Sequence, residues 1–174
     1  MLSCRTQCIA IEKLNMTNWP QITINPDAAA LSSLRQHWGW MLGDKWEALM
    51  FSAIGDVFFS VPAGSVWWLS TATGSLEQIA DSREHFERLL LGEDADEWFL
   101  PGLALALREH GKPLAADQCY SYTVFPVFEQ GSFSVENMHA ISAAEYFEIS
   151  GKLHESIRAL PDGSDVTLCW NARA

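Results

Sequence analysis

Short apolar runs alternate with turn signals between residues 46 and 80. The runs are rich in aromatic and β-branched side chains, and residues such as Gly, Pro and Asp separate them. They lie at residues 46–53, 56–61, 65–71 and 75–80. Runs of this length, with a period near two, are typical of β-strands joined by tight turns. The pattern predicts a meander of about four antiparallel strands.

The second and third runs are joined by Val61-Pro62-Ala63-Gly64. Pro at the second position suits a type I turn because its ring fixes φ, and Gly suits the left-handed residue that closes a three-residue hairpin loop. The sequence therefore predicts a hairpin in which Val61 pairs with Ser65.

This register places large aromatic side chains on both faces of the hairpin. Phe59 lies opposite Trp67 on a continuously apolar face, which we expect in the core. Phe58 lies opposite Trp68 on the other face, where Asp56 and two serines frame the pair. We expect this second face to be partly covered or to bind a partner.

Apolar residues recur at helical spacing in four further segments. These segments are 25–42, 82–90, 92–113 and 142–163. Asp27 is the expected N-cap of the first, and Asp81-x-x-Glu84 resembles a capping box for the second. The third is expected to end at His110 and to hold Pro101 in its first turn or to kink there.

Residues 118–133 alternate as one more strand, interrupted at Pro126, which suits a strand end or an edge. Because strands run together and helices then cluster, the expected fold class is α+β: an antiparallel sheet of about five to six strands with helices packed on it, in a single domain. The expected organisation is a loosely ordered extension at 1–20, a helical segment of the same domain at 21–45, the α+β domain at 46–163 and a tail or strand at 164–174.

The chain has 22 acidic and 11 basic residues and a net charge of −11. This balance disfavours direct binding of nucleic acid, which needs clustered Lys and Arg, and it would speed encounter with a basic partner. Keeping the protein in solution is the plainer explanation. The acid run from Glu93 to Glu97 also has two interpretations: favourable electrostatics at a helix N-terminus, or a patch that faces a partner.

No motif with catalytic spacing is present. The sequence lacks Gly-x-Ser-x-Gly and phosphate-binding glycine loops, and its five histidines are scattered, so we predict no enzyme activity, metal site or cofactor. Four cysteines, Cys4, Cys8, Cys119 and Cys169, are expected to stay as thiols in the cytoplasm. No apolar run approaches the ~18 residues of a membrane span.

Three stretches together, 55–80, 100–128 and 151–163, resemble in order and spacing the C-terminal domain family of type VI secretion system immunity proteins that neutralise DNase effectors. The resemblance extends from Trp46 to Gly163. It is carried by Gly55-Asp56, the Gly64-Ser65-Val66-Trp67 hairpin, Gly74-Ser75-Leu76, Cys119-Tyr120 and Pro126-Val127.

The resemblance implies a non-catalytic immunity protein that binds and neutralises a cognate toxic effector, a basic nuclease, in the cytoplasm. It implies no direct contact with nucleic acid or membrane, and it leaves open whether the protein forms a homodimer. We expect the partner-binding residues to be Phe58, Trp68, Asp94, Asp96 and Glu97. The alternatives are a small-ligand-binding or regulatory domain with aromatic side chains around a concave pocket, and an unrecognised enzyme with titratable groups converging in one.

Overall fold

The predicted meander is present in the computed structural model, which describes residues 19–161 and 163–166. Its four strands form one antiparallel sheet in the order β1-β2-β3-β4. Their bounds are β1 Glu47–Phe51, β2 Val57–Ser60, β3 Val66–Ser70 and β4 Ser75–Ala80. Chain order and sheet order are therefore the same.

A second antiparallel sheet holds two strands, β5 (Gln118–Tyr122) and β6 (Met138–Ser142). The sequence predicted one strand over residues 118–133, interrupted at Pro126, whereas the observed strand ends at Tyr122. The sequence did not predict β6. The strands thus lie in two sheets rather than one, although the Tyr120 amide donates to the Ala53 carbonyl at 2.8 Å and links β5 to the turn after β1. The α+β class is confirmed.

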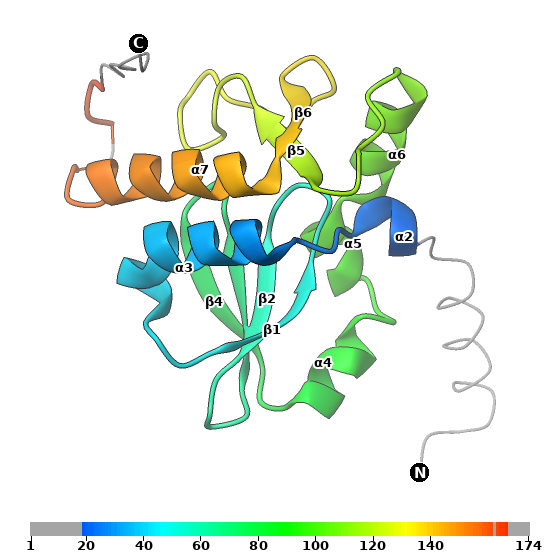
Figure 1. The fold of residues 1–174 in the computed structure, drawn as a ribbon, viewed down its shortest axis with the longest axis vertical. Helices are drawn as coiled ribbons and strands as arrows, with labels where there is room; N and C mark the ends of the chain where they lie inside the picture. The colour runs from blue at the N-terminus through cyan, green and yellow to red at the C-terminus, as the bar shows by residue number, and fades with distance from the viewer. Residues whose placement is uncertain (1–18, 162, 167–174) are drawn as a thin grey trace.

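The helices are distributed around the larger sheet (Figure 1). Their bounds are α2 Trp19–Ile22, α3 Ala28–Leu42, α4 Arg83–Leu89, α5 Asp94–Phe99, α6 Pro101–Glu109 and α7 Ala143–Ile157. The long helices α3 and α7 lie side by side. They approach so closely that a Cβ added at Gly151 of α7 would lie 2.5 Å from the His37 carbonyl oxygen of α3.

Helices cover both faces of the larger sheet. Neighbouring residues of a strand point to opposite faces, so their contacts show which helices lie on each side. Phe59 contacts Trp46 at 5.7 Å between ring centroids, and Arg35 of α3 lies over the Trp46 ring. Phe58 points the other way and contacts Phe86 of α4 at 5.6 Å. The sheet is therefore enclosed by α3 and α7 on one side and by α4 and α5 on the other.

The predicted hairpin register is confirmed. Phe58 pairs with Trp68 and Phe59 with Trp67, and the Val61 amide donates to the Ser65 carbonyl at 3.1 Å. Gly64 has φ 92°, the left-handed conformation that the loop requires.

The observed helix ends agree in part with those predicted from the sequence. Asp27 caps α3 by accepting from the Ala30 amide at 2.8 Å, as predicted. The predicted capping box of α4 is displaced by one residue, since Ser82 rather than Asp81 is the N-cap. The expected third helix is two helices, α5 and α6, because Leu100 adopts a left-handed conformation with φ 42° and Pro101 begins α6.

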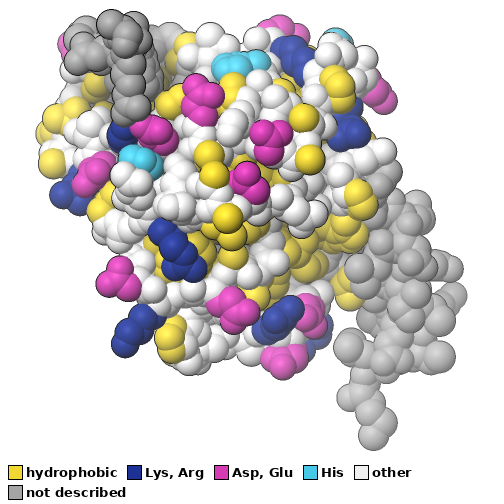
Figure 2. All heavy atoms as spheres, viewed as in Figure 1, with side chains coloured by type: hydrophobic (Ala, Val, Ile, Leu, Met, Phe, Trp, Pro, Cys, Tyr) yellow, Lys and Arg dark blue, Asp and Glu magenta, His cyan; other side chains and the backbone are white. Residues whose placement is uncertain are grey.

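Within the described residues, no helix combines the length and apolar character that crossing a membrane requires. Most of the expected N-terminal extension lies outside the described residues, as do Cys4, Cys8 and Cys169. On the face shown in Figure 2, hydrophobic side chains form a band through the middle, and acidic side chains are spread over the whole face.

Candidate functional site

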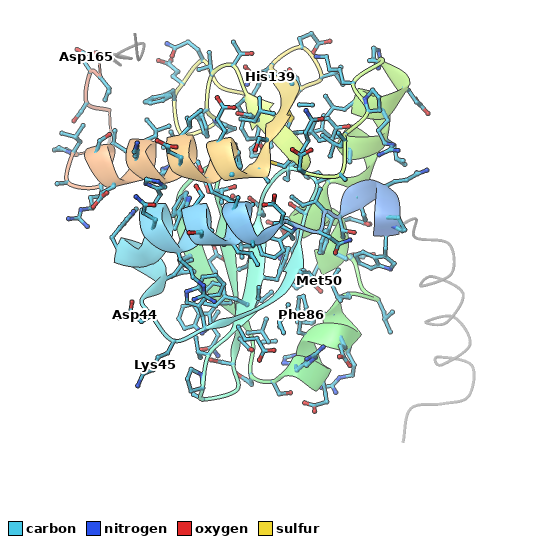
Figure 3. All side chains as sticks on the ribbon, in the orientation of Figure 1. Asp44, Lys45, Met50, Phe86, His139 and Asp165 are labelled. Atoms are coloured by element: carbon cyan, nitrogen blue, oxygen red, sulfur yellow. The ribbon has the colours of Figure 1, made fainter. Side chains whose placement is uncertain are left out.

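Phe58 is fully buried, with an exposed fraction of 0%. Its ring stacks on Phe99 at 4.8 Å and contacts Trp98 at 5.9 Å, so α5 covers it. Phe86 of α4, which is labelled in Figure 3, contacts the same ring. The expectation that Phe58 faces a partner directly is corrected by this burial: its hairpin face is covered by the chain's own helices.

Trp68, the cross-strand neighbour of Phe58, is half-buried. Its ring lies 6.4 Å from Trp98 of α5, and its indole Nε1 donates to Asp56 Oδ2 at 3.3 Å. Part of the Trp68 ring therefore remains available to a partner while its polar atom is held by the protein itself.

The predicted acidic residues lie on α5. Asp94, Asp96 and Glu97 are exposed in its first turn, whereas Trp98 and Phe99 on the same helix are buried. The helix thus has an outer acidic side and an inner aromatic side. Because the inner side packs on Phe58 and Trp68, the structure brings all five predicted residues to one region, which we call the α5 surface.

A buried polar network, which the sequence did not predict, lies beside this region and is centred on Asp56. Asp56 is 1% exposed, and its Oδ1 accepts from the Thr71 amide at 2.9 Å and from the Thr71 hydroxyl at 3.2 Å. The Thr71 hydroxyl is also hydrogen-bonded to the Tyr146 hydroxyl of α7 at 3.0 Å. Through these bonds, the network joins the β2-β3 hairpin to α7.

Burial dominates the ionisation of this network. It raises the pKa of Asp56 from 3.8 to about 7, although hydrogen bonds from Thr71 and Trp68 favour the carboxylate. It also raises the pKa of Tyr146 well above its ordinary value and lowers the pKa of His154. His154 Nε2 lies 3.1 Å from the Thr71 carbonyl oxygen, at the edge of the network.

Two tyrosines provide a matched test of the network. Tyr146→Phe should lower the free energy of unfolding by about 1–3 kcal/mol, because it removes the bond to Thr71 inside the protein. Tyr122→Phe should change that free energy by less than about 1 kcal/mol, since the buried Tyr122 hydroxyl has no hydrogen-bond partner among the described residues. Chemical denaturation of both variants measures the difference, and equal losses would contradict this account of the network.

The described residues contain no group of three or more His, Cys, Asp or Glu side chains placed to hold a metal ion. Cys119 is buried and free, and burial raises the pKa of its thiol, so the nucleophilic thiolate is disfavoured.

Residues outside the α5 surface border two further cavities in the described part of the chain. One, of about 470 Å³, lies near the C-terminal end of α7 and is bordered by residues including Trp40, His154 and Arg158. The other, of about 410 Å³, lies between the smaller sheet and α7 and is bordered by residues including Ser121, His139 and Glu145. We call the second the β5–β6 pocket. The sequence predicted neither cavity, because each is formed by segments far apart in the chain.

Comparison with protein families gives a match over residues 80–154 to the family model described as T6SS immunity protein Tdi1, C-terminal. The resemblance to type VI secretion immunity proteins is thereby confirmed for this segment, which includes α5, both strands of the smaller sheet and most of α7. Residues 46–79, which hold Gly55-Asp56 and the aromatic hairpin, lie outside the match. The match supports an immunity function. Among curated proteins, none matches the chain.

The crystal structure of Atu4351 from Agrobacterium tumefaciens has a similar fold. The TM-score is 0.50 with 18% sequence identity, and the match covers 70% of this chain and 63% of that chain. At this identity the similarity concerns the fold alone. This chain matches less than two thirds of the other protein's length.

Proposed function

We propose that this protein is a non-catalytic type VI secretion immunity protein that binds a cognate toxic effector, a basic nuclease, in the cytoplasm and blocks its activity. The observation that carries the proposal is the family match over residues 80–154. The net charge of −11 is consistent with it, because an acidic protein associates quickly with a basic one. The proposed function needs no cofactor and no direct contact with nucleic acid or membrane.

We assign the effector contact to the α5 surface. Asp94, Asp96 and Glu97 supply exposed negative charge, and the sequence holds no Lys or Arg from residue 89 to residue 107 to neutralise it locally. Trp68 supplies a partly exposed aromatic side chain at the same place, and Phe58 supports it from beneath. A central aromatic anchor surrounded by charges is a common arrangement in protein interfaces.

Co-expression tests the function. The product of the neighbouring gene is expressed alone and together with this protein, and we expect growth arrest in the first case and rescue in the second. A neighbour that is not toxic, or a toxic neighbour that this protein fails to neutralise, would contradict the immunity function. The two cavities would then favour the alternative of a small-ligand-binding domain, since their volumes lie in the range of such sites.

Charge reversal tests the surface. The triple variant Asp94→Lys, Asp96→Lys, Glu97→Lys should slow association with the effector at least about tenfold at low salt, because it replaces attraction by repulsion. A matched control reverses three exposed acids elsewhere, Asp44, Glu47 and Glu155. Stopped-flow mixing gives the rates and thermal melting confirms folding. Equal rates for the two triple variants would remove the assignment to α5 and leave the immunity function intact.

A further inference from the structure

The β5–β6 pocket lies between the smaller sheet, the loop after β5 and α7. His139, on β6 at the top of the view in Figure 3, marks its position. Its walls include Ser121, Phe128, His139, Ile141, Glu145 and Ile149. At about 410 Å³ it is large enough for a long side chain from another protein.

The loop that forms one wall of the pocket is held in place by its own hydrogen bonds. Asn137 accepts from the Val124 amide at 2.9 Å and donates to the Val124 carbonyl at 2.7 Å, as a paired strand would. Lys112 Nζ donates to the carbonyls of Val135 at 2.6 Å and Met138 at 2.7 Å, on the return segment. The pocket is thus preformed, and a ligand need not order the loop.

The polar side chains of the pocket include one carboxylate, which suits a cation. Among the described residues that border it, Glu145, in the first turn of α7, is the one acidic residue, and none is Lys or Arg. Ser121 and His139 are direct cross-strand partners at the same wall, so their side chains project from the same face of the smaller sheet. An anion would meet the Glu145 carboxylate without a balancing positive side chain.

The remaining walls are apolar. Phe128, Ile141 and Ile149 are half-buried and border the same space as Glu145. A side chain with an aliphatic stem and a positive end matches this combination, since the stem covers apolar surface while the charged end reaches a carboxylate.

We propose that the β5–β6 pocket receives an arginine or lysine side chain of a protein partner, with the charged end at Glu145 and the stem along Phe128, Ile141 and Ile149. The proposal rests on the proposed function for the identity of that partner, the basic effector. The pocket would add a specific contact, separate from the α5 surface, that selects an effector with a basic side chain at one position.

The test uses the full chain labelled for NMR and two capped amino acids as probes: N-acetyl-arginine-methylamide and its norleucine analogue. We expect the arginine probe to shift the amide signals of Ser121, His139 and Ile141, and the norleucine probe to leave them in place. Glu145→Gln should weaken arginine binding about two- to fivefold, the size of an ion pair at an exposed carboxylate. The matched control is Glu155→Gln, which changes an exposed acid of α7 outside the pocket and should leave the affinity unchanged.

The outcomes separate this proposal from the proposed function. Absence of localised shifts, equal shifts with norleucine, or shifts that depend on protein concentration rather than on arginine would overturn the cation pocket; the last would indicate a second copy of this chain as the occupant. If Glu145→Lys also rescues growth as well as the unchanged protein does, the pocket is not used by the effector although immunity stands. Specific arginine binding, together with a neighbouring gene product that is not toxic, would support the cation pocket and contradict the immunity function.

Discussion

Phe58→Ala is expected to lower the free energy of unfolding by about 3–5 kcal/mol, the range for truncating a buried Phe. Phe58 has no exposed surface and contacts three aromatic rings from two helices, Phe86, Trp98 and Phe99. Removing it leaves a cavity between the sheet and the α4–α5 layer that rigid aromatic neighbours fill poorly. Urea denaturation followed by tryptophan fluorescence measures the loss.

Phe133→Ala is the matched control for this prediction. Phe133 is 44% exposed, so the same truncation should cost less than about 1.5 kcal/mol. Under conditions in which both variants are folded, Phe133→Ala should leave the affinity for the effector unchanged, and Phe58→Ala should affect it only through the position of Trp68, which Phe58 supports. A Phe58→Ala protein with unchanged stability but weakened effector binding would indicate that Phe58 lies at the surface, and would contradict the packing described above.

The hairpin shows how much of the fold the sequence could predict. Its register follows from the turn residues Pro62 and Gly64 and from a period of two, both of which are local, and the predicted pairs agree with the observed ones. The same locality explains the prediction of α3 from Asp27. What covers each face of the hairpin is not a local property. Phe58 and Trp68 are covered by Trp98 of α5, which follows them by 40 and 30 residues, and no local periodicity in the sequence indicates such a contact.

The candidate site was predictable to a similar extent. The acid run from Glu93 to Glu97 is visible in the sequence, and α5 places three of its members on the surface. The sequence predicted that Pro101 would lie in a first helical turn or kink the helix, and Pro101 does begin α6. The left-handed conformation of Leu100 was not predicted, because it is disfavoured by the Leu side chain. Gly151 lies inside α7, where Gly is a weak helix former; the structure gives a reason for it, the close approach of α3.

Asp56 was interpreted from the sequence as part of the polar frame around an aromatic pair on a partly covered or partner-binding face. In the structure it is 1% exposed and bonded to Thr71 and Trp68. Sequence pattern alone does not distinguish a solvated carboxylate at a strand end from a buried one, because the difference depends on α7 covering that end through Tyr146. The consequence is a carboxyl group whose charged form is disfavoured by the fold.

This burial gives the stability of the protein an unusual dependence on pH. The folded pKa of Asp56, about 7, lies above its ordinary value of 3.8. Between these two values the folded protein keeps a proton that the unfolded chain has released, so the contribution of Asp56 to stability falls as pH rises from about 4 to about 7. The contribution is fully present below pH 4 and absent above pH 7. The change in pKa corresponds to a fall of about 4 kcal/mol at most.

Asp56→Asn isolates this effect, because the amide does not titrate. The variant loses an acceptor for the Trp68 indole, which shifts its stability by an amount that does not depend on pH. Other groups with shifted pKa values, such as Glu84 and His154, titrate in both proteins and cancel in the difference. The stability of the unchanged protein minus that of Asp56→Asn, measured by urea denaturation from pH 4 to pH 8, should therefore fall up to pH 7 and then level off. A difference that stays flat across this range would mean that Asp56 titrates near its ordinary pKa, and hence that the carboxylate reaches water in solution.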